Sequence, residues 1–164
     1  MTDYTLFDDP ELLSLADLDF QGDRHEAALS KLKILLSRGS APLQTYALLG
    51  RIYATIGLLT KAKQAFGFYL DNESESERRV NETFQLGLVE KDMGNIEDAI
   101  TIWDDLLNSM PEHSPTLYQK ALALIGKGEK QAAVDLLNRV LETADDNDPY
   151  IPMADQMLSK LALQ

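Results

Sequence analysis

The stretch that decides the fold runs from Leu43 to Ser74 and reads LQTYALLGRIYATIGLLTKAKQAFGFYLDNES. Two small residues in it, Gly50 and Ala62, lie twelve positions apart, and Gly57 falls between them. Two antiparallel helices joined by a tight turn approach closely only where the side chains at their crossing are small. The stretch is therefore predicted to form a helical hairpin that turns at Gly57.

The same pattern recurs along the chain. The twelve-residue separation appears at three further pairs of small residues, Ala16 and Ala28, Gly87 and Ala99, and Ala121 and Ala133. A large apolar residue follows the second member of each pair by four positions, at Leu32, Phe66, Trp103 and Leu137. Turn residues lie between the pairs, at Gly22-Asp23, Gly57, Gly94-Asn95 and Gly128. Four hairpins are predicted, in register at 34, 37 and 34 residues, and the surplus is interpreted as an added turn at the start of the third hairpin.

Helix-start signals agree with this register. Asp9-Pro10, Ser114-Pro115 and Asp148-Pro149 each combine an N-cap residue with a proline, which loses no hydrogen bond at the first helical position. The last pair predicts one further helix that covers the open end of the fourth hairpin or, alternatively, contributes to a dimer contact. The acidic tail before the first pair is expected either to rest on the nearest helix or to dock in a groove of its own chain or of a partner.

The repeated residues also match a known pattern. Seven residues of the second hairpin form this pattern by their order and spacing: Tyr46, Leu49, Gly50, Tyr53, Gly57, Ala62 and Phe66. This pattern resembles the tetratricopeptide repeat. The resemblance implies an all-α, right-handed superhelical solenoid of antiparallel helix hairpins with about nine helices. The expected organisation is a tail over 1–8, hairpins over about 9–42, 43–79, 80–113 and 114–147, and a C-terminal capping helix over 149–164.

Composition excludes several classes of partner and compartment. The 164 residues include 27 acidic and 15 basic side chains, a net charge of −12, which repels phosphate backbones and anionic membrane surfaces. There are no cysteines, so disulfides and thiolate sites are excluded. The N-terminal stretch lacks the basic start and apolar run of a secretory signal, and no segment reaches the roughly 20 apolar residues that a membrane-spanning helix needs. We expect a soluble, cytoplasmic protein that binds no nucleic acid and inserts in no membrane.

The residues that catalysis or metal binding requires do not occur in suitable patterns. His25 and His113 lie far apart in the repeat scheme, and no third ligand accompanies either of them. The acidic run over 145–148 lacks the alternate ligands, central glycine and distant glutamate of a calcium loop. Neither a glycine-rich phosphate loop nor a nucleophile elbow is present. The chain is expected to be no enzyme and to need no metal or cofactor.

Surface recognition is the remaining function, and the resemblance implies where it occurs. In tetratricopeptide solenoids the first helix of each hairpin lines a concave groove. The corresponding positions, taken by phase, are Leu13, Asp17 and Phe20, then Ala47, Arg51 and Ala54, then Phe84, Leu88 and Lys91, and finally Tyr118, Leu122 and Ile125. Family members that clamp a C-terminal carboxylate use Lys, Asn and Arg there; only Arg51 and Lys91 are basic here, and no Asn accompanies them. A carboxylate clamp is therefore not expected.

The second half of this predicted groove is apolar, at Phe84, Leu88, Tyr118, Leu122 and Ile125. These residues are interpreted either as anchors for a partner or as core shared with the neighbouring repeat and covered by the C-terminal helix. The leading hypothesis is a non-enzymatic protein-interaction scaffold that binds a peptide or amphipathic helix with apolar anchors. The alternatives are a self-associating assembly subunit, such as a homodimer, and a chaperone, because size, charge and repeat type resemble the translocator chaperones of bacterial type III secretion.

Overall fold

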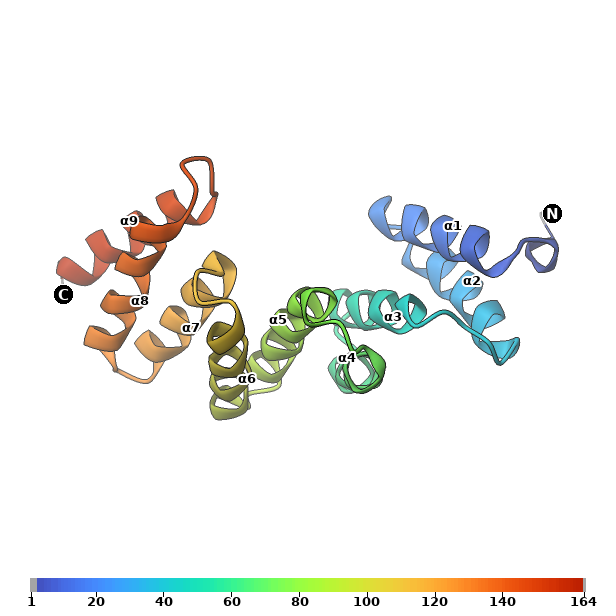
Figure 1. Cartoon of the computed structure of the whole chain (residues 1–164), viewed down its shortest axis with the longest axis horizontal. Helices are drawn as coiled ribbons and strands as arrows, with labels where there is room; N and C mark the ends of the chain where they lie inside the picture. Colours follow the sequence, from blue (N-terminus) through green and yellow to red (C-terminus); the bar gives the residue numbers. More distant parts are fainter. Residues whose placement is uncertain (1–2, 164) are drawn as a thin grey trace. The chain divides into compact units, whose positions relative to one another are not determined.

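The computed structural model describes residues 3–163, and all the regular elements within them are helices (Figure 1). Met1, Thr2 and Gln164, at the ends of the expected tail and capping helix, lie outside the described residues. The elements are the short 3-10 helix η1 (Tyr4–Leu6) and the α-helices α1 (Asp9–Gln21), α2 (His25–Ser37), α3 (Gln44–Thr55), α4 (Leu59–Asn72), α5 (Ser76–Asp92), α6 (Ile96–Ser109), α7 (Ser114–Gly126), α8 (Lys130–Thr143) and α9 (Tyr150–Ala162). The predicted all-α repeat fold is confirmed.

The chain divides into two compact units, Met1–Val89 and Glu90–Gln164, and the boundary lies within α5. The main core of unit 1 draws on all of its first four helices, through Leu12, Ala16, Ala28, Leu32, Leu35, Leu48, Leu49, Ile52 and Ala65. The core of unit 2 draws on α6 to α9, through Leu107, Leu117, Tyr118, Ala121, Leu124, Ala133, Leu137, Val140 and Ala154. Each core therefore contains residues of more than one hairpin, as stacked repeats require.

Consecutive helices pair in antiparallel hairpins, α1 with α2, α3 with α4, and α7 with α8. The small residues lie where the paired helices approach most closely. A Cβ atom added to Gly50 would lie 2.6 Å from the Phe66 ring of the facing helix. Ala16 and Ala121 are fully buried at the equivalent positions. The twelve-residue spacing in the sequence thus corresponds to real helix crossings.

All four hairpin turns have the same backbone conformation. Asp23, Gly57, Gly94 and Gly128 have positive φ angles of 57°, 77°, 87° and 81°. The N–H of the next residue donates to the carbonyl five positions back, as in Arg24 to Asp19 at 2.8 Å and Leu58 to Tyr53 at 2.8 Å. In the first hairpin the glycine lies one position early, and Gly22 has a φ of −91°. Asp23 instead takes the left-handed conformation, so the turn stays in register without a glycine.

The first and last described elements pack within their own units. Tyr4 and Phe7 pack against the core of unit 1, and Arg38 donates to the Phe7 carbonyl at 2.8 Å. The tail therefore rests on α2, as one of the two interpretations expected. Helix α9 packs against α8 and α7, and its Ala154 is buried in the core of unit 2.

The three predicted N-caps, Asp9, Ser114 and Asp148, each differ from the structure by one position, because the N-cap residues are Asp8, His113 and Pro149. The N-cap of α1 is Asp8 and not Asp9: Asp8 Oδ1 accepts from the Glu11 N–H at 2.8 Å, and Glu11 Oε2 accepts from the Asp8 N–H at 3.1 Å. Asp9 pairs with Arg38 at 2.5 Å instead. Helix α5 has 17 residues against 12 in α3, so its extra length accommodates the surplus between the second and third hairpins.

Candidate functional site: a pocket between α1 and α3

Helices α1 and α3, the first helices of two successive hairpins in unit 1, form a pocket of about 280 Å³. Its lining residues are Leu13, Ser14 and Asp17 of α1 and Gln44, Leu48 and Arg51 of α3. Leu13 and the adjacent Ser14 each lie about one helical turn before Asp17, and Gln44, Leu48 and Arg51 follow one another at about one turn, so each set lies on one side of its helix. Three of these residues, Leu13, Asp17 and Arg51, were predicted from the repeat phase, and the structure brings them together.

Three lining residues were not predicted from the sequence. Gln44 and Leu48 precede Arg51 by seven and three positions, so helical periodicity already placed them on the same face. Ser14 adjoins Leu13, and its hydroxyl donates to the Pro10 carbonyl at 2.9 Å. Gln44 is the more useful addition, because it is polar, exposed and adjacent to Arg51 along the pocket.

Arg51 is the chemically distinctive member of this pocket. Its Nε atom is buried and has no hydrogen-bond partner among the described residues. Asp17, on the opposite wall, accepts a hydrogen bond from Gln21 Nε2 at 2.6 Å and forms no ion pair with Arg51 in the described structure. A buried N–H without a partner is costly, and such groups are normally satisfied by ordered water or by a ligand. Arg51 therefore carries a buried, unsatisfied donor and lines a pocket whose other walls combine Leu13 and Leu48 with the polar residues Ser14, Asp17 and Gln44.

Phe20 and Phe84 are positioned mainly by core packing. Phe20 packs against the core of unit 1, with its ring centroid 5.7 Å from that of His25. Phe84 in α5 is only 8% exposed, whereas Leu88, one turn later, is half-buried. Leu88 is thus the more accessible of the two predicted α5 residues in unit 1.

The remaining predicted residues belong to unit 2. Tyr118 is 7% exposed, and Tyr150 of α9 approaches it with ring centroids 5.5 Å apart. Leu122 and Ile125 are partly buried against the core of this unit, and Lys91 Nζ donates to Gln119 Oε1 at 3.1 Å. At Tyr118 the packing therefore agrees with the core interpretation, in which the C-terminal helix covers the residue. A continuous apolar wall that joins these residues to Phe84 and Leu88 stays a prediction.

The histidine and acidic side chains of the described residues are dispersed along the helices and turns. No three His, Cys, Asp or Glu side chains in residues 3–163 are placed to hold a metal ion. His113 is half-buried with Nδ1 2.7 Å from Thr116 Oγ1, and burial lowers the pKa of its imidazole despite the opposing effect of Asp148. Asp148 itself accepts from the Tyr150 N–H at 2.8 Å at the start of α9. None of the described helices is both long and apolar enough to cross a bilayer.

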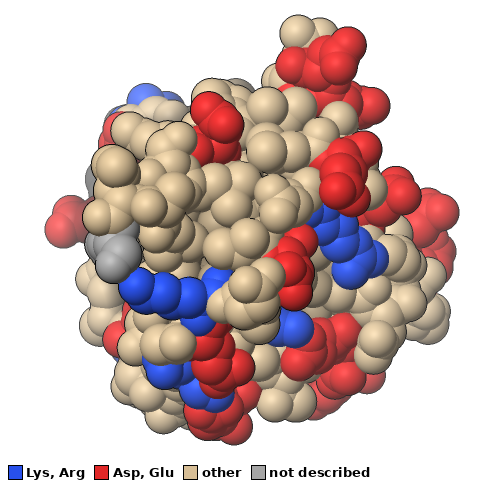
Figure 2. Space-filling model, turned by 90° about the vertical axis from the view of Figure 1, so that its left-hand side faces the viewer, with Lys and Arg blue, Asp and Glu red and all other residues tan. Residues whose placement is uncertain are grey.

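The surface carries the acidic surplus of the sequence. Figure 2, which looks onto the side where α8 and α9 lie, shows acidic side chains spread more widely than basic ones around an uncharged area. Such a surface offers no extended basic patch on this face for a polyanionic partner.

Comparison with known families supplies the identity of the repeat. The description "Tetratricopeptide repeat" applies to two matching stretches, residues 43–67 and residues 116–147. They cover parts of the second and fourth predicted hairpins. The chain contains tetratricopeptide repeats.

Solved structures of tetratricopeptide type share this fold. A crystal structure of MamA has a TM-score of 0.72 and 23% identity, and the match covers 80% of this chain and 75% of MamA. A tetratricopeptide repeat protein from Parabacteroides merdae has a TM-score of 0.74 and 22% identity, with 93% and 59% covered. PilF of Pseudomonas aeruginosa has a TM-score of 0.74 and 15% identity, with 93% and 72% covered. No curated protein sequence matches the chain.

Proposed function

We propose that this tetratricopeptide repeat protein is a cytoplasmic, non-enzymatic scaffold that holds a peptide or amphipathic helix of a partner protein across α1 and α3. A protein-interaction role in general accords with the repeat family. The finer proposal rests on one observation, the buried Nε of Arg51, which lacks a partner among the described residues and belongs to a side chain that lines the pocket.

The lining defines the chemistry of the bound segment. Arg51 donates to an oxygen acceptor, which is a main-chain carbonyl or a side-chain carboxylate of the partner. Half-buried Leu13 provides contact for one apolar anchor, and the buried Leu48 lies behind it at the floor of the pocket. Asp17 on the opposite wall disfavours a second carboxylate nearby, so the partner places one acceptor, and not an acidic cluster, at this point.

The other predicted groove residues, Phe20, Phe84, Leu88, Lys91, Tyr118, Leu122 and Ile125, stay predictions. Among them Leu88, Leu122 and Ile125 retain some exposure, so a longer partner is expected to meet these three before the buried Phe84 and Tyr118.

The decisive experiment compares the wild-type chain with Arg51→Met. Proteins that co-purify with the wild type from its source cells are identified by mass spectrometry, and the affinity of the main partner is then measured by calorimetry. A hydrogen bond from a charged donor contributes about 1.5–3 kcal/mol, so we expect affinity to fall by about 10- to 150-fold. The thermal midpoint should stay unchanged or rise, because methionine removes an unsatisfied buried donor and keeps the side-chain length.

Lys130→Met is the matched control, since it removes an exposed positive charge at the start of α8 in unit 2. It should leave affinity unchanged. Undiminished binding by Arg51→Met would remove the α1–α3 pocket from the interaction. Equal loss of binding and of helical circular dichroism would show that Arg51 is structural.

A further inference from the structure

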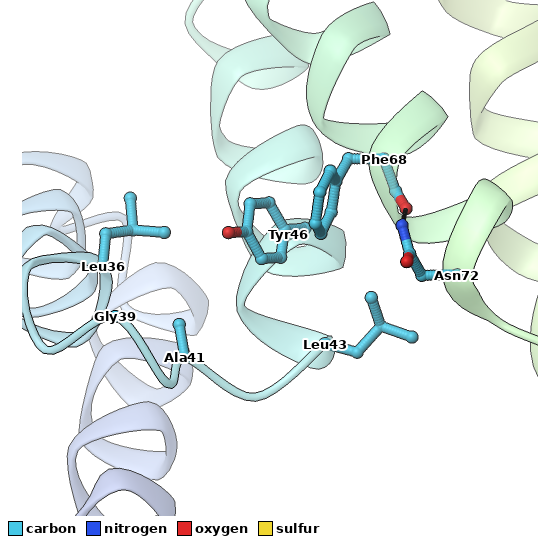
Figure 3. A pocket seen from close by; sticks show the side chains of 7 residues that line it. All are labelled: Leu36, Gly39, Ala41, Leu43, Tyr46, Phe68 and Asn72. Atoms are coloured by element: carbon cyan, nitrogen blue, oxygen red, sulfur yellow. Dashed lines mark hydrogen bonds between the residues drawn. The ribbon is translucent and has the colours of Figure 1, made fainter.

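A second surface of unit 1 lies where α2 and α4 flank α3, and it shares no residue with the α1–α3 pocket. Two hollows of about 430 and 420 Å³ lie there, and the side chains of Tyr46 and Phe68 line both of them. Figure 3 shows the Tyr46 and Phe68 rings side by side in the first hollow, with Leu36 of α2 across from them. We call this surface the aromatic groove.

Phe68 is an aromatic residue at a position where the packing of the repeat does not require one. It is 46% exposed, and its ring centroid is 4.0 Å from that of Tyr46. The equivalent positions in the other hairpins, at offsets of 34, 37 and 34 residues, are Ile34, Asp105 and Arg139. The repeat therefore tolerates a charged residue at this position, and packing does not require an aromatic one. A large exposed aromatic residue beside a hollow is typical of a binding surface.

The charge of the groove is the second observation. No lining residue of either hollow is Asp or Glu, although the chain carries a net charge of −12. The only charged lining residue is Lys61, whose Nζ lies 5.6 Å from the Tyr53 ring centroid. At the equivalent positions the other hairpins have Ala27, Asp98 and Ala132. The lysine, like the phenylalanine, is specific to this hairpin.

We propose that the aromatic groove docks a short acidic segment of a partner protein that carries one aromatic or large aliphatic anchor. The anchor side chain lies between Leu36 and Phe68, and an acidic side chain pairs with Lys61. From Phe68 to Lys61 the groove follows seven residues of α4, which is about 10 Å at 1.5 Å per residue. An extended peptide rises about 3.3 Å per residue, so the anchor and the acidic residue are about three positions apart. Most of the surface of this negatively charged protein repels acidic peptides, so a groove whose charged residue is a lysine binds them selectively.

The test selects binders from a phage-displayed library of random peptides about twelve residues long, a length that exceeds the groove. The enriched peptides should share an acidic residue about three positions from an aromatic or large aliphatic one. A fluorescein-labelled synthetic copy of the leading peptide is then titrated with the wild type and two variants by fluorescence polarisation. Phe68→Ala should weaken binding about tenfold or more, as loss of an anchor does. Lys61→Glu should weaken binding of this peptide by a similar factor. The same variant should bind more tightly a second peptide in which lysine replaces the acidic residue.

Matched controls separate the groove from the rest of the surface. Leu18→Ala removes another exposed apolar side chain, 56% exposed on α1, and Lys63→Glu reverses a charge two residues from Lys61 and about 200° around α4. Both should leave affinity unchanged, and so should Arg51→Met, which tests the α1–α3 pocket. Lys61 is exposed, so Lys61→Glu should keep the wild-type thermal midpoint. Phe68→Ala loses the ring contact with Tyr46 and should lower the midpoint by only a few degrees, with the helical circular dichroism unchanged.

Three results would overturn the proposal. The first is a selection that yields no peptides, or peptides without an acidic residue. The second is an affinity that neither Phe68→Ala nor Lys61→Glu changes. The third is a wild-type dimer in analytical ultracentrifugation that Phe68→Ala dissociates, since the occupant would then be a second copy of this chain.

Discussion

Asp19 lies at the position where the second hairpin has Tyr53 and the fourth has Leu124. It is only 8% exposed and accepts hydrogen bonds from Lys31 Nζ at 2.5 Å and from Arg24 Nε at 2.9 Å. Lys31 in turn lies 4.2 Å from the centroid of the Tyr4 ring. The first hairpin therefore replaces an aromatic core residue with a buried ion pair, and the N-terminal tail covers that pair.

This ion pair predicts a pH dependence of stability. Burial acts to raise the pKa of Asp19, but the hydrogen bonds and charges of Lys31 and Arg24 outweigh it, and the net result is a lowered pKa. A carboxyl whose pKa is lower in the folded state stabilises the fold above its unfolded pKa, and that contribution is lost as pH falls through the folded value. The free energy of unfolding of the wild type should therefore exceed that of Asp19→Asn by a constant amount near neutral pH. The difference should shrink below about pH 4.

Urea titrations of both proteins at a series of pH values measure this difference, and the comparison cancels the effect of the other carboxyl groups. Asp146→Asn is the control, because it removes a negative charge from an exposed side chain. A difference that grew as pH fell would contradict the lowered pKa.

At the scale of the helical element, the crossing of α3 and α4 depends on a pairing of sizes. Gly50 faces the fully buried Phe66. In the first and fourth hairpins the corresponding pairs are Ala16 with Leu32 and Ala121 with Leu137, which lie in the two main cores. Glycine thus accompanies the larger ring, and alanine accompanies leucine. The sequence repeats the glycine–aromatic combination in the third hairpin, with Gly87 and Trp103.

Gly50→Ala should lower the free energy of unfolding by about 1–3 kcal/mol, because its Cβ overpacks a filled crossing. The double variant Gly50→Ala/Phe66→Leu recreates the pair found in the first hairpin and should recover part of that loss, which a double-mutant cycle in urea measures. Gly67→Ala in α4 is the control, and it should change the free energy of unfolding in the opposite direction. A Cβ added there meets no atom within 4 Å, so alanine should add about 0.5–1 kcal/mol. Equal effects of the two alanine substitutions would refute the size pairing.

At the scale of the whole molecule, the net charge of −12 opposes compactness. Its acidic surplus is visible on the surface in Figure 2. Most ion pairs in the described structure are partly solvent-exposed and contribute little each, whereas the surplus of like charges acts over the whole chain.

Moderate salt should therefore stabilise the protein. Sodium chloride screens charges beyond about 8 Å at 0.15 M ionic strength, so the thermal midpoint should rise from low to physiological salt by a few degrees. Scanning calorimetry in a dilute buffer, with and without sodium chloride, measures the change. If the midpoint fell instead, local pairs such as Lys31 with Asp19 would outweigh the net repulsion.

Helical periodicity made much of the candidate site predictable. Leu13, Asp17 and Arg51 share a pocket because residues at equal phase in successive repeats occupy equal places on successive helices. The unsatisfied Nε of Arg51 was not predictable, since it depends on which neighbours come within hydrogen-bond distance. The same holds for Asp19: its sequence position marked a departure from the repeat, but only the folded chain shows that Lys31 and Arg24 compensate it.

The sequence by itself determined the helices, their turns and their pairing in hairpins. Gly50 with Ala62, and the turn at Gly57, act over a few residues, where backbone geometry and side-chain size decide the structure. Only the tertiary structure decided which side chains stay accessible. Tyr118 is covered by Tyr150, whereas Phe68 remains exposed beside Tyr46, although all four are aromatic residues on helices. The exposure of a side chain depends on the neighbours that packing brings from distant parts of the chain. The periodicity of residues within one helix does not predict these neighbours.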